Sequence, residues 1–125
     1  MAGRSSDWLK QAVHDLEQAR ASQRDGRHDW ACFAAHQAAE NAAKAMHLAR
    51  GQDASGHAVA TLLAELPQRA PAALIDKARA LDNVATRYAD GHPGGAPFEH
   101  YGALQSEQAI DYAAEILEYA RTEVG

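Results

Sequence analysis

The chain has little of what disulfide-linked folds, β-sheets and membrane spans require. Cys32 is its single cysteine among 125 residues, which excludes an internal disulfide and any zinc site with more than one thiolate. Val, Ile, Thr and Phe are scarce, whereas alanine fills 30 positions. This composition favours helices and leaves little material for strands.

Long apolar runs are also missing. The first fifteen residues carry charges where a signal peptide needs an apolar stretch, and no segment approaches the ~20 apolar residues of a membrane span. The net charge is −5, so the chain lacks the basic surplus of a general nucleic-acid or anionic-membrane binder. We therefore expect a cytoplasmic protein without membrane contact, in which any phosphate contact is local.

Apolar spacing and helix-end signals predict four long helices and one short helix. The expected ranges run from Ser5 or Ser6 to about Arg24, from His28 to Ala49, from His57 to Leu66, from near Pro71 to the glycine-rich segment, and from Leu104 to Glu123. Because most connections are short, the sequence predicts an all-α fold, an antiparallel up-and-down bundle, with residues 1–125 as one domain.

The second helix carries an unusually broad apolar arc, formed by Trp30 and by alanines spaced along 31–49. This arc is wider than the ~100° stripe that one neighbouring helix covers. We therefore expect the helix to be central in its bundle or shared with a second subunit. Cys32 is expected to be a small buried hydrophobe rather than a thiolate paired with His36.

The opposite face of this helix is polar. His36, Glu40 and His47 share it and could be read as metal ligands, but Lys44 lies beside them. The order Glu40 then Lys44 is the favoured one for an ion pair one turn apart. We therefore interpret this face as a solvated or subunit-facing stripe and expect no metal. The acidic series Glu107, Asp111, Glu115 and Glu118 is likewise expected on the outside of the last helix.

The segment 89–97 holds three glycines and two prolines, so we expect it to be irregular. Arg87 precedes it and His92 lies within it. An arginine binds phosphate through a bidentate fork and a histidine transfers protons near neutral pH, so this pair suits metal-independent cleavage of a phosphodiester by the ribose 2′-hydroxyl. The alternative is that both residues have only structural roles. The arginine would then compensate the dipole at the C-terminal end of a helix, and the histidine would be solvated. Arg50 and His57 have a similar spacing, so the distance in sequence between an arginine and a histidine does not by itself identify a catalytic pair.

Three segments together resemble the prokaryotic HEPN domain family: WACFAAHQAAENAAKAM at 30–46, Gly56-His57, and Thr86-Arg87-Tyr88 leading into DGHP at 90–93. The likeness covers nearly the whole chain, from Trp8 to the final helix. It implies an up-and-down bundle that is usually a homodimer. Many members are metal-independent endoribonucleases with a cleft built from both subunits, and many are toxins paired with a minimal nucleotidyltransferase antitoxin.

Carried over to this chain, the resemblance implies that Arg87 binds the scissile phosphate and that His92 is the general acid and base. No cofactor is expected. The binding groove is expected to include Tyr88, Asp90, Tyr101 and His57.

Two functions from different classes stay open. The first is a dimeric ribonuclease toxin that uses Arg87 and His92. The second is a non-catalytic module that binds a nucleotide, an RNA or a partner protein through the same groove. In the second case Arg87 anchors an anion and Tyr88 or Tyr101 offers a stacking face.

Overall fold

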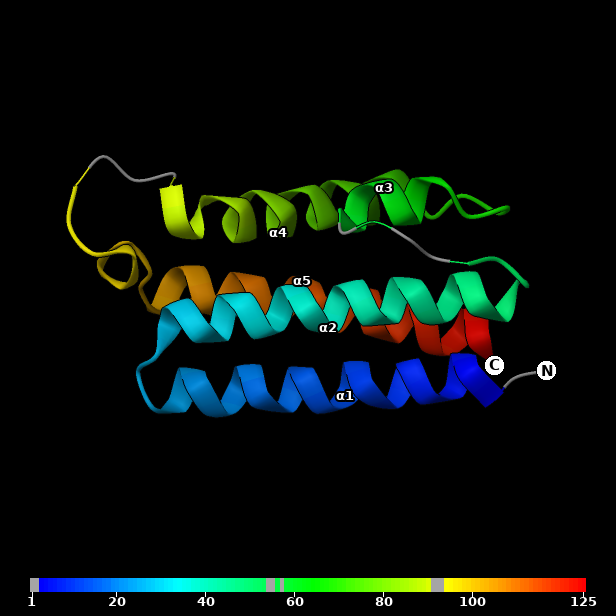
Figure 1. Ribbon diagram of the computed structural model, residues 1–125, viewed down its shortest axis with the longest axis horizontal. Helices are drawn as coiled ribbons and strands as arrows, with labels where there is room; N and C mark the ends of the chain where they lie inside the picture. The colour runs from blue at the N-terminus through cyan, green and yellow to red at the C-terminus, as the bar shows by residue number, and fades with distance from the viewer. Residues whose placement is uncertain (1–2, 54–55, 57, 91–93) are drawn as a thin grey trace.

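The computed structural model describes residues 3–53, 56, 58–90 and 94–125, and for residues 86–90 it describes the backbone only. These residues form helices and connections, and none of the described residues forms a strand. The elements are α1 (Gly3–Arg24), α2 (His28–Ala49), α3 (Val59–Ala64), α4 (Ala72–Asp90), the 3-10 helix η1 (Pro97–His100) and α5 (Ala103–Val124). The all-α bundle of four long helices and a short one is confirmed (Figure 1).

Helix α2 lies at the centre of the molecule. It contacts every other helix, from α1 on one side to α3 and α4 on the other (Figure 1). Its alanines at 31, 35, 38, 39, 42, 43 and 45 have no exposed surface at all. Small side chains at these positions let the neighbouring helices approach closely. The predicted central position of α2 is therefore confirmed within one copy of the chain.

The other long helices contribute apolar residues to the same core. The buried core includes residues from α1, α4 and α5, namely Ala12, Leu16, Ala19, Ile75, Ala78, Leu81, Ile110, Ala113, Ile116, Leu117 and Ala120. The acidic series of α5 lies on its exposed face, as predicted.

The polar stripe of α2 is not solvated, and this prediction was wrong. His36, Glu40 and His47 are only 7%, 6% and 5% exposed. The two histidines are covered by α3 and α4: His36 Nε2 lies 2.9 Å from Asp82 Oδ1 of α4, and the Nε2–H of His47 donates to the Leu62 carbonyl of α3 at 2.7 Å. The expected ion pair is present, with Lys44 Nζ 2.9 Å from Glu40 Oε2.

A carboxylate that is only 14% exposed joins α2, α3 and α4. Asp82 of α4 accepts hydrogen bonds from His36 Nε2 at 2.9 Å and from the backbone amides of Val59 and Ala60 at 2.8 and 3.0 Å. Burial by itself raises the pKa of Asp82, but these hydrogen bonds outweigh it and the pKa is lowered. We call His36, Val59, Ala60 and Asp82 the Asp82 junction. It caps the start of α3 and fixes α4 against α2.

Three helices have ends that differ from the prediction. Helix α1 begins at Gly3, so Ser5 and Ser6 lie inside its first turn and do not cap it. Helix α3 is shorter than the predicted range, spanning 59–64. Helix α4 continues to Asp90, and therefore includes the first two residues of the segment expected to be irregular. Polar and apolar periodicity fixes helix interiors better than helix ends.

Candidate functional site

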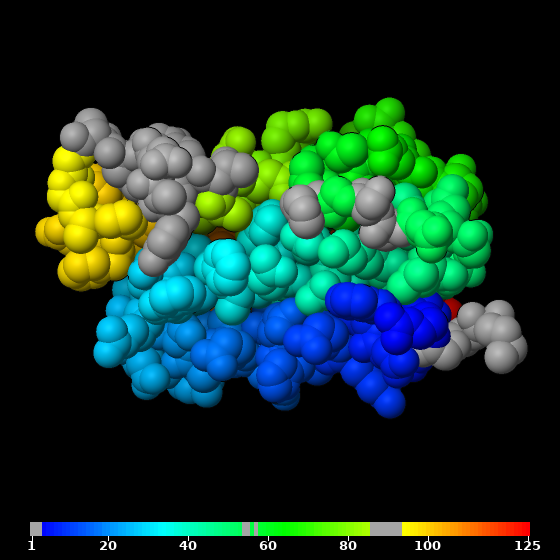
Figure 2. Space-filling view, in the orientation of Figure 1, coloured from blue at the N-terminus to red at the C-terminus, as the bar shows by residue number. Residues whose placement is uncertain are grey.

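One end of the bundle gathers the segments that carry the predicted site. We call it the α4 end: residues 22–33, where α1 ends and α2 begins, residues 84–90 of α4, and residues 94–106, which hold η1 and the start of α5. In Figure 1 these segments meet at the same end of the molecule, and in Figure 2 residues 94–100 lie at that end above the start of α2.

Ser106 holds three helices together at the α4 end. It is completely buried. Its hydroxyl lies 2.8 Å from His28 Nδ1 at the start of α2 and accepts a hydrogen bond from Gln23 Nε2 of α1 at 3.2 Å. The same hydroxyl donates to the Ala103 carbonyl of α5 at 3.1 Å. The end of α1, the start of α2 and the first turn of α5 therefore have a fixed relation.

Tyr101 attaches the segment after η1 to α4. Its hydroxyl donates to the Val84 carbonyl at 3.0 Å, and the residue is only 9% exposed. A small gap between α2 and α4 is lined by Cys32 and Phe33 on one side and by Val84 on the other, with Tyr101 next to them. The last part of α4 is thus held against the first turns of α2.

The structure places the backbone of three predicted site residues at the α4 end. Arg87 and Tyr88 lie in the last turn of α4, one turn beyond Val84, and Asp90 is the last residue of the helix. Their side chains are outside what the structure describes. His92 and His57 also lie outside the described residues. Catalysis by Arg87 and His92 therefore stays a prediction, as do the binding roles of Tyr88, Asp90 and His57.

The fourth predicted binding residue, Tyr101, lies at the same end in a different role. Its ring is buried and its hydroxyl holds α4, so Tyr101 would have to leave this position before a base could stack on it. The geometry observed makes it a residue that positions the end of α4.

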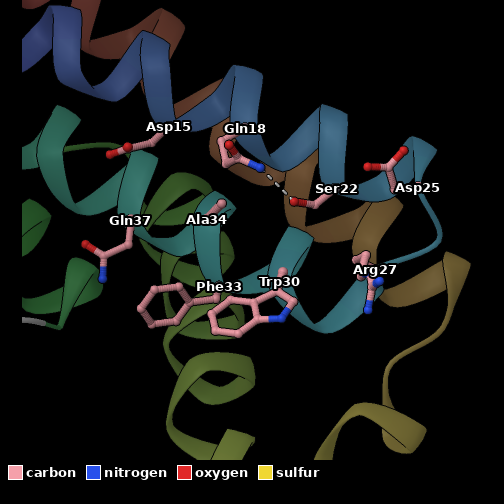
Figure 3. Close-up of a pocket in the computed structure, with 9 residues that line it drawn as sticks. All are labelled: Asp15, Gln18, Ser22, Asp25, Arg27, Trp30, Phe33, Ala34 and Gln37. Atoms are coloured by element: carbon pink, nitrogen blue, oxygen red, sulfur yellow. Dashed lines mark hydrogen bonds between the residues drawn. The ribbon is translucent and has the colours of Figure 1, made fainter.

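Two neighbouring hollows open at the α4 end. The first, of about 490 Å³, lies between α1 and α2. Figure 3 shows Trp30 and Phe33 side by side on α2, with Arg27 beyond Trp30 and with Gln18 and Ser22 opposite them on α1. The second hollow, of about 410 Å³, lies between the α1–α2 turn and η1, and Phe98 lines it.

Aromatic rings are exposed at these hollows. Trp30 is 53% exposed, and Phe33 and Phe98, the two phenylalanines of the chain, are 43% and 61% exposed. Trp30 and Phe33 meet edge to face, with centroids 6.1 Å apart. The predicted inward position of Trp30 was wrong, because Trp30 faces the hollows and the alanines of α2 form the core. The clue available in the sequence was that two of the few large aromatics stand three residues apart in a helix otherwise rich in alanine.

Cys32 is not a reactive group of this site. It is 2% exposed, and burial, with a smaller contribution from Asp29, raises the pKa of its thiol to about 11. The thiol is therefore neutral at physiological pH and a poor nucleophile. The prediction that Cys32 is a small buried hydrophobe is confirmed.

Metal ligands and membrane spans were both searched for in the described part of the chain. There, no three His, Cys, Asp or Glu side chains are grouped so that they could hold a metal ion. None of the helices in that part is long and apolar enough to cross a membrane.

Comparison with known proteins identifies the family. The HEPN domain model matches residues 5–123. The solved structure of TT1696 from Thermus thermophilus is 47% identical, with a TM-score of 0.91, and the match covers 96% of this chain and 98% of that one. An archaeal HEPN homologue, ST0689, is 33% identical, with a TM-score of 0.85 and coverage of 97% and 98%.

A HEPN domain protein from Thermotoga maritima is 34% identical, with a TM-score of 0.76 and coverage of 93% and 95%. None of the curated proteins matches the chain. The family model and the structural relatives agree over almost the full length, and the fold is the one that the resemblance implied. The chain belongs to the HEPN family.

Proposed function

We propose that this HEPN protein is an endoribonuclease that cleaves RNA without a metal ion at the α4 end. The observation that carries the proposal is the position of Arg87, in the last turn of a helix that Tyr101 and the start of α2 hold in place. That turn belongs to the end of the bundle where two hollows and three exposed aromatic rings are found. An RNA chain there would have both a phosphate anchor and surfaces for its bases.

The reaction requires a phosphate anchor and a proton carrier. His92 takes the proton of the ribose 2′-hydroxyl as O2′ forms a bond to the adjacent phosphorus. The bond from phosphorus to O5′ then breaks, and the leaving oxygen receives a proton from the imidazolium. Arg87 binds the phosphate oxygens while their negative charge grows. The products are a 2′,3′-cyclic phosphate and a 5′-hydroxyl.

The partners proposed for this enzyme are a second copy of the chain and an antitoxin. In the toxin reading, two copies contribute Arg87 and His92 to one cleft, and a minimal nucleotidyltransferase neutralises the dimer. Light scattering at tens of micromolar tests the first part, because a monomer at that concentration removes the shared cleft.

The cleavage test uses a mixed RNA pool in excess chelator. Wild type is compared with Arg87→Ala and His92→Ala, and with the matched control variants Arg20→Ala and His14→Ala, which change exposed residues of the same types on α1. We expect both site variants to lose about 100-fold or more in rate and both controls to keep the wild-type rate. Equal cleavage by all five proteins would reject the assignment.

A second candidate is a non-catalytic module that binds a nucleotide or RNA at the same end. The exposed rings of Trp30, Phe33 and Phe98 favour it, because base stacking on aromatic side chains needs no catalytic residue. Under this reading wild type shows no chelator-resistant cleavage. RNA binding then falls in Arg87→Ala and persists in His92→Ala.

A further inference from the structure

The two hollows of the α4 end are parts of one surface. Both are lined by Asp25, Arg27 and Trp30, so these residues form the wall between them. Phe33 lines only the first hollow, next to Trp30, and Phe98 lines only the second. Each volume, about 490 and 410 Å³, is in the range of cavities that hold small organic molecules.

The linings of the two hollows combine aromatic rings with polar side chains. Aromatic faces stand next to hydrogen-bonding groups, among them Gln18, Gln37 and the carboxylate of Asp25 in the first hollow. The core of a protein–protein interface is instead depleted of charged residues. A nucleobase fits the mixed lining because it offers a flat π-face together with donors and acceptors on its edge.

Positive charge is local at this surface. The exposed guanidinium of Arg27 stands at the wall that the two hollows share (Figure 3). The linings also hold the carboxylates of Asp15, Asp25 and Asp29, so Arg27 is the single cationic side chain among the described lining residues. Arg27 is therefore the lining group suited to a phosphate, with a base on either side.

From these observations we infer that single-stranded RNA binds here as two successive nucleotides, one base in each hollow, with Arg27 at the phosphate between them. One base stacks on Trp30, beside Phe33, and the other on Phe98. The inference rests on the proposed action on RNA, because it names the form of the substrate. Bases within a duplex are stacked on one another and cannot reach these rings.

The test measures direct binding of a short RNA oligonucleotide with 2′-O-methyl groups, which cannot be cleaved by its own 2′-oxygen. Fluorescence anisotropy at low salt compares wild type with Trp30→Leu and Phe98→Leu, which remove the π-face and keep an apolar side chain. We expect each to weaken binding about 10-fold, and Trp30→Phe to retain most of the affinity. Leu104→Ala changes an apolar residue that is 76% exposed and lines neither hollow, and it should bind like wild type.

Two further measurements sharpen the assignment. Replacing Arg27 with Gln should reduce the dependence of log affinity on log salt by about 0.7, the contribution of one phosphate contact in a single strand. A duplex of the same sequence should not compete with the single strand. Circular dichroism confirms that each variant is folded before binding is measured.

The results separate this inference from the proposed enzyme. Unchanged binding in Trp30→Leu and Phe98→Leu overturns the inference, whereas cleavage that depends on Arg87 still supports the enzyme. Loss of binding in both variants, with no cleavage by wild type, keeps the inference and removes the enzyme. Failure of wild type to bind the oligonucleotide, equal competition by the duplex, or a change of oligomeric mass in Trp30→Leu each overturns the inference. A change of mass would assign the rings to a protein interface.

Discussion

The Asp82 junction and the α4 end differ in which kinds of side chain are exposed to solvent. At the junction, ionisable side chains are buried and paired: the side chains of His36 and Asp82 are 9% and 14% exposed and 2.9 Å apart. At the α4 end, large apolar rings are exposed, with Phe98 at 61%. A polar group with satisfied partners inside the protein specifies how helices pack, whereas exposed rings beside hollows are what the proposed RNA contact requires.

The two regions also differ in how many contacts they make with elements that are distant in the sequence. Asp82 meets α2 and the start of α3, so one carboxylate fixes three elements. Phe98 belongs to a four-residue 3-10 helix in which no residue is buried. We therefore expect substitutions at the junction to change the free energy of unfolding, and substitutions at the exposed rings to change binding.

Among substitutions in the two regions compared, Asp82→Ala has the largest expected effect on stability. The variant leaves His36 Nε2 and the amides of Val59 and Ala60 without their acceptor, and each lost partner costs about 1–3 kcal/mol. Part of this is recovered through water, so we expect a loss of about 3 kcal/mol in the free energy of unfolding, measured by urea titration.

Asp76→Ala is the control for this substitution, on the same helix. The Asp76 carboxylate is 74% exposed and pairs with Arg79 at the surface. Such pairs contribute about 0–1 kcal/mol. If the two variants lost the same stability, the Asp82 junction would have no special role.

Cys32→Ser is expected to have an intermediate effect. The serine hydroxyl would enter a site that is 2% exposed, at a penalty of about 1–2 kcal/mol, whereas Cys32→Ala should cost less than Cys32→Ser. A thiol reagent provides an independent check: with the thiol pKa raised to about 11, reaction at neutral pH should follow unfolding. Rapid modification of the folded protein would contradict the buried, neutral thiol.

The pH dependence of the junction is a smaller effect with a definite sign. The pKa of Asp82 is lower in the folded protein than the ordinary carboxyl value, so the ionised form stabilises the fold. This contribution is fully present above the unfolded pKa of about 4 and is lost as pH falls through the folded value. The stability gap between wild type and Asp82→Asn should therefore be constant above about pH 5 and narrow in acid. A gap that widened as the pH fell would contradict the assigned direction.

Much of the fold could be predicted from sequence because the evidence for it is local. Gly26 interrupts the helical pattern before α2, and Gly51 follows its last turn, so these two glycines mark both ends of the helix. The structure gives His28–Ala49 as predicted. The polar stripe was misplaced because its explanation is not local. Helical spacing puts His36 and His47 on one face, but their partners, Asp82 and Leu62, come from elements that only the tertiary structure brings there.

The predicted site stays a prediction, and sequence and structure can be compared only at the residues around it. Arg87 and the residues after it were singled out by their chemistry, and the structure puts the backbone of Arg87 at the end of α4. Trp30 was assigned to the core because apolar periodicity does not distinguish a ring that faces the interior from one that faces a hollow. The position of Phe98 next to the glycine-rich segment does not predict its exposure, because the exposure depends on how η1 packs.

The smallest expected effect is that of Phe98→Ala on stability. Because the ring is mostly exposed and η1 contributes no buried residue, its removal should change the free energy of unfolding by less than about 1 kcal/mol. Leu81→Ala in α4, where the side chain is 1% exposed, should cost about 2–5 kcal/mol in the same urea titrations. A loss at Phe98 as large as that at Leu81 would show that the ring supports the fold. The contrast between a structural junction and the proposed ligand-binding end would then fail at this residue. A near-neutral Phe98→Ala would agree with a role of this exposed ring, one of two phenylalanines in the chain, in binding.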